Sequence, residues 1–255
     1  MVIRDWSSDV CSSDLAEFFL SGAVDYLGKS LLSKDLQLKR IKAAWYFKPF
    51  AEDSAANNHL PTVKDNWVLL KNGWKGIEQG KEYTFCFLYV EIDMVEEWKK
   101  KSGRAHIDKI LDIFHRHIEK TFVPYGGKIW MWMNHGGLVL FPFNGENCTF
   151  LEACLRLVLN RRIISIEEYG YNTLITYKMA VHIGNTIYKT RGETGEIISD
   201  SINFLFHIGK KYAEKERFYV TESVKPFMPQ GLAELFKQNG DFEGVKMYSL
   251  RLPKK

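Results

Sequence analysis

One apolar stretch, residues 84 to 93, constrains the fold of this chain more than any other. Its sequence, TFCFLYVEID, is rich in β-branched and aromatic residues, which is typical of a central strand that is covered on both faces. The stretch ends in Glu91 and Asp93. Because strand residues two apart share a face, these two carboxylates could jointly present oxygen to a cation, or they could simply solvate the strand end.

A helix and a two-stranded ribbon are predicted directly after this strand. Apolar residues recur at helical spacing from about Val95 to Phe122, and Gly103 interrupts the pattern near its start. The glycine pair at 126–127 then ends the helical pattern and begins the ribbon, which turns on the sequence NHGG at 134–137.

The rest of the chain completes an α+β fold. The pattern predicts a helix over 150–164, a long strand pair over 173–189, a helix over 199–213, a strand over 217–220, a short helix, and a final strand over 245–250. The order β-α-β-β-α-β with an added αβ unit is a ferredoxin-like palm. An N-terminal helix over 17–47 is expected to precede it.

Five motifs between residues 84 and 250 resemble, in order, those of the class III adenylate and guanylate cyclase catalytic domains. They are YVEI at 89–92 (family F-x-D-I), GGKIWMWMNHG at 126–136 (G-G-x-x-x-K-T-x-G-D-G), AVHIG at 180–184 (G-I-H-T-G), EIISDSIN at 196–203 (D-x-W-G-x-x-V-N) and TESV at 221–224 (V-S-E-x-V). The resemblance implies the palm of a nucleotidyl cyclase.

The resemblance also implies a metal site, with two departures from the family pattern. Two aspartates in this family hold two Mg²⁺ ions; the first falls on Glu91, with Asp93 beside it, and the second falls on His135. Mg²⁺ prefers oxygen ligands in near-octahedral geometry, so imidazole is a poor replacement, while softer Mn²⁺ tolerates it better. A site for Mg²⁺ or Mn²⁺ that is weakened or lost is therefore expected.

The other family roles fall on residues that fit them unequally. The base-reading lysine falls on Met131, which has no donor, and its partner acid falls on Glu196. The asparagine that stabilises the transition state is kept as Asn203, whereas the arginine falls on His207. An arginine in that role can contribute about 10³ to 10⁵ in rate, so the resemblance implies little turnover.

The diguanylate cyclases share the same palm and form an alternative. The segment Glu91-Ile92-Asp93 also resembles their D-x-D strand end. Their ribbon turn would read G-G-D/E-E-F, however, whereas this chain has NHGGL at 134–138. Residues 199–203 have no counterpart in that family, and we therefore prefer the class III resemblance.

Histidines and methionines outside these roles have simpler interpretations. His115 and His117 are two apart on a helix, so they should diverge rather than chelate one metal. His182 is expected to be buried and hydrogen-bonded. His135 with Glu91 and Asp93 could alternatively form a transition-metal site.

The first 15 residues stand apart from everything that follows. The sequence DWSSDVCSSDL at 5–15 resembles a translated sequencing adaptor, and we set it aside as an artefact. Three segments are then predicted: the artefact at 1–15, an N-terminal helix and connector at 16–82, and the cyclase-like domain at 83–252. On this interpretation an upstream domain is missing before Ala16.

Charge and cysteine usage limit the partners and the compartment. Without the one arginine and three aspartates of residues 1–15, the formal charge rises from +4 to +6, which is too small and too dispersed for a nucleic-acid footprint. No run of 18 apolar residues is present to span a membrane. Cys86, Cys148 and Cys154 lie in apolar settings, which predicts buried free thiols in a reducing cytoplasm.

Three functions remain open at this point. The leading interpretation is a divergent cyclase-homology domain in cyclic-nucleotide-type signalling that is catalytically impaired and acts as a regulatory or dimerisation module. It would form a homodimer, as the resemblance implies, and bind a nucleoside triphosphate, for which Lys210 and Lys211 are candidate phosphate ligands. The alternatives are an active cyclase that uses Mn²⁺ with the atypical ligands, and a protein-interaction module whose pocket is filled.

Overall fold

The computed structural model describes residues 63–93, 95–102, 104–133, 135–167, 169, 174–189 and 199–251. The expected artefact at 1–15, the N-terminal helix over 17–47 and Glu196 lie outside these residues, so the structure does not test them. No helix of the described part is both long and apolar enough to cross a membrane.

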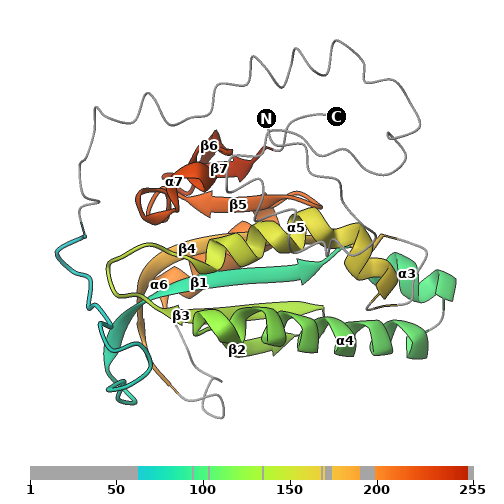
Figure 1. The fold of residues 1–255 in the computed structure, drawn as a ribbon, viewed down its shortest axis with the longest axis horizontal. Coiled ribbons are helices and arrows are strands. Elements are labelled where there is room, and N and C mark those ends of the chain that lie inside the picture. Colours follow the sequence, from blue (N-terminus) through green and yellow to red (C-terminus); the bar gives the residue numbers. More distant parts are fainter. Residues whose placement is uncertain are drawn as a thin grey trace, which may run out of the picture. The chain divides into compact units, whose positions relative to one another are not determined.

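A seven-stranded sheet forms the centre of the described part (Figure 1). In chain order the strands are β1 Glu82–Ile92, β2 Lys128–Met133, β3 Gly136–Pro142, β4 Tyr177–Ile187, β5 Phe218–Thr221, β6 Phe236–Phe242 and β7 Val245–Leu250. They lie side by side in the order β2-β3-β1-β4-β5-β7-β6. All neighbours are antiparallel except β4 and β5. The predicted α+β palm with an added αβ unit is confirmed.

Helices cover both faces of this sheet. They are α3 Val95–Ser102, α4 Arg104–Phe122, α5 Phe150–Glu167, α6 Asp200–His207 and α7 Gln230–Ala233, with a π-helix at Ile208–Tyr212 and 3₁₀ turns at Val123–Tyr125 and Lys225–Phe227. Figure 1 shows α4 and α5 on one side of the sheet and α6 on the other. Residues of β1 such as Phe87 pack against Ile202 and Leu205 of α6.

The central strand β1 is buried on both faces, as its composition predicts. Side chains of Phe85, Phe87, Leu88 and Val90 are fully buried. Aromatic and aliphatic residues therefore alternate between the two helix layers rather than between core and solvent. This double burial holds the carboxyl end of β1 in a fixed position, which matters because Glu91 and Asp93 lie there.

Two details of the predicted topology are wrong. Residues 173–189 were expected to form a strand pair, but the described part of this range contains a single strand, β4, because its whole length pairs with β1. The edge strand β6 was not predicted at all. Its sequence, FKQNGDF, is polar and almost entirely exposed, so it lacks the alternation that marks a half-buried strand.

The β2–β3 ribbon depends on its two glycines. A Cβ on Gly136 would overlap the carbonyl group of Val90, and one on Gly137 would overlap the carbonyl oxygen of Met131. The neighbouring backbones leave no room for a side chain, and glycine is required here for close approach rather than for an unusual φ. The ribbon can thus bring His135 close to β1.

Candidate functional site

A cavity of about 400 Å³ lies at the carboxyl end of β1. The strand β1, the β2–β3 ribbon and the π-helix each contribute to its wall. Its lining residues are Tyr89, Glu91, Met133, His135, Gly136 and Lys210. The structure thus brings Glu91 and His135, the two residues at the family's metal positions, to one cavity.

Both oxygens of Glu91 already have partners inside the protein. Its Oε2 accepts a hydrogen bond of 2.6 Å from the Tyr89 hydroxyl and lies 3.1 Å from Lys178 Nζ. Its Oε1 is paired with Lys210 Nζ. Burial raises the pKa of Glu91, but the hydrogen bonds from Lys210 and Tyr89 and the charge of Lys178 outweigh it, so the pKa lies below its usual value. Glu91 is therefore an ionised and fully engaged carboxylate.

Each lysine reaches Glu91 for a distinct structural reason. Lys178 lies opposite Glu91 in the antiparallel register of β1 and β4, where facing side chains come within contact. Lys210 comes from the π-helix that follows α6. At Gly209 that helix passes so close to Tyr89 that a Cβ would overlap the Tyr89 ring. The sequence pattern indicates Lys210 only as a candidate phosphate ligand and gives no sign of Lys178.

Asp93 does not line the cavity, although it lies only two residues from Glu91. Its Oδ2 accepts a 2.9 Å hydrogen bond from the backbone N–H of Glu216, and its side chain is buried. Arg161 donates to the carbonyl oxygens of Glu216 and Tyr177, each at 3.0 Å. Asp93 and Arg161 therefore hold the turn at Glu216, a non-glycine residue with φ of 64°, from both sides. We call this arrangement the Asp93–Arg161 clamp.

Residues at the base-reading positions are apolar or undescribed. Met131 packs against the core cluster that includes Trp130, and Trp130 Nε1 donates to the carbonyl oxygen of Lys189 at 3.1 Å. Glu196, the partner acid, lies outside the described residues. Met131 is thus a partly buried residue that packs against the core, and its thioether offers no strong hydrogen bond to a base.

Asn203 and His207 lie on α6, outside the cavity of their own chain. Asn203 is exposed. His207 is half-exposed, and its Nδ1 lies 3.0 Å from Glu243 Oε1 in the β6–β7 turn. The structure thus separates these two residues from Glu91 and His135 within one chain.

The cavity residues do not fit a pair of Mg²⁺ ions. Glu91 is bound by two ammonium groups and a hydroxyl, and Asp93 is committed to the clamp. His135 supplies nitrogen, and its Nε2 lies 3.5 Å from Glu96 Oε1. Across the residues that the structure describes, no group of three or more His, Cys, Asp and Glu side chains is arranged to hold a metal ion. Mg²⁺ prefers oxygen ligands in near-octahedral geometry, and the one carboxylate that lines this cavity is already paired with two lysines.

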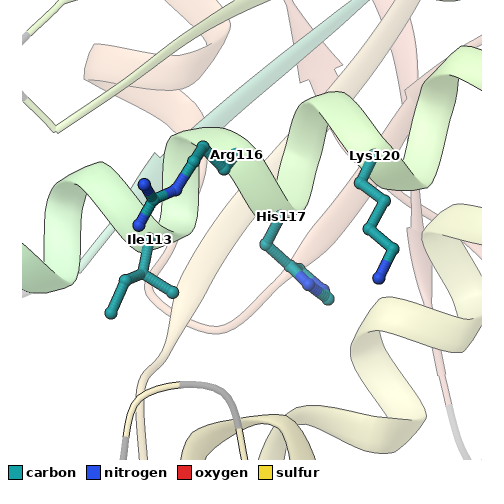
Figure 2. A pocket seen from close by; sticks show the side chains of 4 residues that line it. All are labelled: Ile113, Arg116, His117 and Lys120. Carbon is teal, nitrogen blue, oxygen red and sulfur yellow. The ribbon is translucent and has the colours of Figure 1, made fainter.

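The other histidines have structural surroundings. His115 packs edge-on against Trp132, with 4.6 Å between ring centroids. His117 instead points into a shallow groove of about 320 Å³ beside Ile113, Arg116 and Lys120 of the same helix (Figure 2). The two side chains of α4 thus diverge, as predicted.

His182 is hydrogen-bonded, as expected. Its Nδ1 lies 3.1 Å from the Thr221 hydroxyl and 3.4 Å from that of Ser223. Burial and the nearby charge of Lys64 lower the pKa of His182 to about 4. The imidazole is therefore neutral near pH 7.

Comparison with known proteins places the fold among nucleotidyl cyclase domains. No family model and no curated protein sequence matches the chain, whereas solved structures of adenylyl and guanylyl cyclase domains do. Because the identities are low, the likeness shows the fold, and the chain has a nucleotidyl cyclase-like fold.

Three of these structures illustrate the extent of the match. The non-canonical dimeric guanylyl cyclase domain of the RhoGC fusion protein from the aquatic fungus Blastocladiella emersonii has a TM-score of 0.54 and 13% identity, with 68% of this chain and 97% of that chain covered. The adenylyl cyclase CyaB from P. aeruginosa has a TM-score of 0.51 and 12% identity, with 69% of this chain and 97% of that chain covered. An adenylate/guanylate cyclase/hydrolase from Silicibacter pomeroyi has a TM-score of 0.51 and 15% identity, with 68% of this chain and 99% of that chain covered.

Proposed function

We propose that this chain is a cyclase-homology domain with little or no turnover, which acts in signalling as a regulatory or dimerisation module. The observation that carries the proposal is the state of Glu91. The carboxylate at the first metal position contacts Lys178, Lys210 and Tyr89. A catalytic ion would therefore have to displace the ammonium groups that already neutralise this carboxylate.

Two further substitutions support low turnover. His207 stands at the position of the transition-state arginine, and its imidazole lies against Glu243. Loss of such an arginine costs about 10³ to 10⁵ in rate in other phosphoryl-transfer enzymes. Met131 removes the base-reading lysine. The losses need not multiply, because residues that act as one unit are not additive.

The placement of Asn203 and His207 supports assembly with a second copy. In the family that this chain resembles, these positions complete the site of the partner chain. Their location outside their own cavity supports the same head-to-tail homodimer here. One neighbouring structure is a guanylyl cyclase domain in a non-canonical dimer, which supports pairing of two copies but not its geometry, and another is a guanylate cyclase domain in complex with GTP. We include a nucleoside triphosphate as a retained ligand.

A cytoplasmic location is part of the proposal. Cys86, Cys148 and Cys154 are all buried free thiols. The sulfur atoms of Cys86 and Cys148 lie 3.4 Å apart without a bond between them. Unpaired thiols in contact are typical of a reducing compartment.

One observation favours a second candidate, an active cyclase that uses Mn²⁺. Glu91 and His135 line the same cavity, and an oxygen with a nitrogen ligand suits Mn²⁺ better than Mg²⁺. A protein-interaction module with a filled pocket is supported by the packing of Met131 against the core.

A turnover assay on the purified chain separates these candidates. We expect no 3′,5′-cyclic product from ATP, GTP, CTP or UTP with either Mg²⁺ or Mn²⁺. Cyclic product with Mn²⁺ would establish the second candidate instead. If calorimetry finds no nucleotide binding under any condition and turnover is absent, the filled interaction module is favoured.

Restoring the family residues tests the same proposal from the other side. The combined variant Met131→Lys, His135→Asp and His207→Arg should raise cyclic product by at least about tenfold over the background, because it returns a metal ligand, a base reader and a transition-state charge. His106→Asp, on the exposed surface of α4, serves as the matched control and should leave the background unchanged. A folded triple variant with no gain would contradict the assignment of these positions.

A further inference from the structure

The Glu91 cavity carries a positive charge of its own where a cyclase would bind metal ions. We infer that this cavity binds phosphate groups with the ammonium of Lys210 and without a divalent cation. The inference rests on the proposed function, since it takes the nucleotide-binding role as given and names how the phosphates are held.

The charges around the cavity favour an anion over a further cation. Glu91 contributes one negative charge, and Lys178 and Lys210 contribute two positive charges in direct contact with it. The Glu96 carboxylate, 3.5 Å from His135, is 71% exposed, so water and salt screen its charge. Tyr89 stays neutral, because burial and its bond to Glu91 raise its pKa well above the usual value. A divalent ion would add to an excess of positive charge, whereas a phosphate would balance it.

Lys210 is the lysine that can turn toward a ligand. Its side chain is 51% exposed, whereas that of Lys178 is 16% exposed. An ammonium has three N–H donors, and the contact with Glu91 Oε1 uses one. The remaining donors of Lys210 are available on the cavity side, while Lys178 and Tyr89 keep Glu91 in place. Lysine is an established phosphate ligand, acting as a point charge.

The backbone conformation around Lys210 places this residue at the cavity. Residues 208–212 form a π-helix in which the Ala213 N–H donates to the carbonyl oxygen of Ile208, five residues earlier, at 2.7 Å. Gly209 lets this turn lie directly on the Tyr89 ring. Single π-turns are rare and occur frequently at functional sites. The position of Lys210 is thus fixed by the fold and is not a chance surface contact.

A divalent cation would bind poorly in the same cavity. To coordinate Glu91 it would have to break the contacts to Lys210 and Lys178, and it would gain only a nitrogen ligand from His135. Mg²⁺ in particular prefers oxygen ligands, so the His135 nitrogen would add little to its binding. The same residues therefore oppose a metal and favour a phosphate.

Calorimetric titration of the full chain with inorganic tripolyphosphate tests the inference. This probe has no base, so the apolar Met131 position does not enter. We expect binding in EDTA that is at least as tight as binding in excess Mg²⁺. Lys210→Met should weaken binding in EDTA by about tenfold or more, and Lys210→Arg, which keeps the charge, should stay within about threefold of the wild type.

Lys211→Met is the matched control, because Lys211 is the next residue of the same π-helix and is exposed. It should change the dissociation constant by less than about twofold. Binding that requires Mg²⁺, binding that is unchanged in Lys210→Met, or no binding of tripolyphosphate would each overturn the inference. The wild-type comparison of EDTA with Mg²⁺ needs no variant, so it decides even if Lys210→Met does not fold. These binding outcomes do not test whether the chain has cyclase turnover. The cyclase assay decides that separately.

Discussion

Glu91 and Asp93 lie two residues apart at the end of one strand, yet their surroundings differ in kind. Glu91 faces the cavity and is bound by the side chains of Lys178, Lys210 and Tyr89. Asp93 is bound by the backbone N–H of Glu216. Burial raises the pKa of both carboxylates, but only at Glu91 do the partners outweigh it; the pKa of Glu91 is lowered and that of Asp93 is raised.

The difference teaches that an acidic pair at a strand end does not by itself define a metal site. The two lysine partners of Glu91 and the backbone partner of Asp93 come from segments more than 80 positions later in the chain. At Glu91 two lysine ammonium groups contact one carboxylate, so this group of three side chains has a net positive charge. At Asp93 the carboxylate instead accepts a hydrogen bond from the backbone of the turn at Glu216 and so stabilises that turn.

The largest effect is expected from breaking the Asp93–Arg161 clamp. Arg161 is 8% exposed, donates two backbone hydrogen bonds and lies over the Tyr177 ring at 4.8 Å. Arg161→Met should lower the free energy of unfolding by about 3 kcal/mol, because two carbonyl groups lose their donor and the nearby Asp93 loses a favourable charge. Urea denaturation followed by circular dichroism measures the loss.

The neighbouring Arg162 provides the control. It is exposed on the same helix α5, and Arg162→Met should change the free energy of unfolding by less than about 0.5 kcal/mol. If both variants lost the same free energy of unfolding, the clamp would not be a stabilising element. The Glu91 and Asp93 regions would then differ in geometry but not in their contribution to stability.

The order of the elements could largely be predicted from sequence, because β1 and the ribbon have strong local signals. The apolar run of β1 has to be buried on both faces, and the glycine pair at 126–127 ends the helical pattern and begins the ribbon. The strand β6 has neither signal. It exists because its backbone pairs with β7, and pairing of that kind leaves no pattern in a polar sequence.

The candidate site could be predicted only in part, for the same reason. The motif resemblance indicated Glu91 and His135, and the structure brings them to one cavity. It could not indicate Lys178, which reaches Glu91 through the β1–β4 register, or the contact of Lys210, which depends on a π-turn. Long-range register and an irregular helix turn are set by tertiary packing, not by local composition.

An intermediate effect is expected from disturbing the cavity side through Gly209. Gly209→Ala would place a methyl group into the Tyr89 ring, and the resulting overpacking should lower the free energy of unfolding by about 1 to 3 kcal/mol. Gly231→Ala on α7 is the matched control, because nothing lies within 4 Å of its Cβ position. It should be neutral or stabilise by up to about 1 kcal/mol. Equal results for the two variants would show that the π-helix is not fixed against Tyr89.

The smallest effect is a difference in pH dependence between Glu91→Gln and Asp93→Asn, each compared with the wild type. The folded pKa of Glu91 is below its ordinary value of 4.5. Its stabilisation is therefore present above that value and is lost as pH falls through the folded pKa. The stability difference between wild type and Glu91→Gln should accordingly shrink on acidification.

Asp93 should show the opposite slope, because its folded pKa is above the ordinary value of 3.8. Its contribution is fully present below that value and is lost as pH rises through the folded pKa, so the wild type should lose stability relative to Asp93→Asn as pH rises. Urea denaturation of the three proteins from about pH 3 to about pH 7 measures both slopes, since this range spans both ordinary values. Slopes of the same sign would mean that the two carboxylates share one environment, and the distinction between a lysine-paired carboxylate in the cavity and a carboxylate in the backbone clamp would then be wrong.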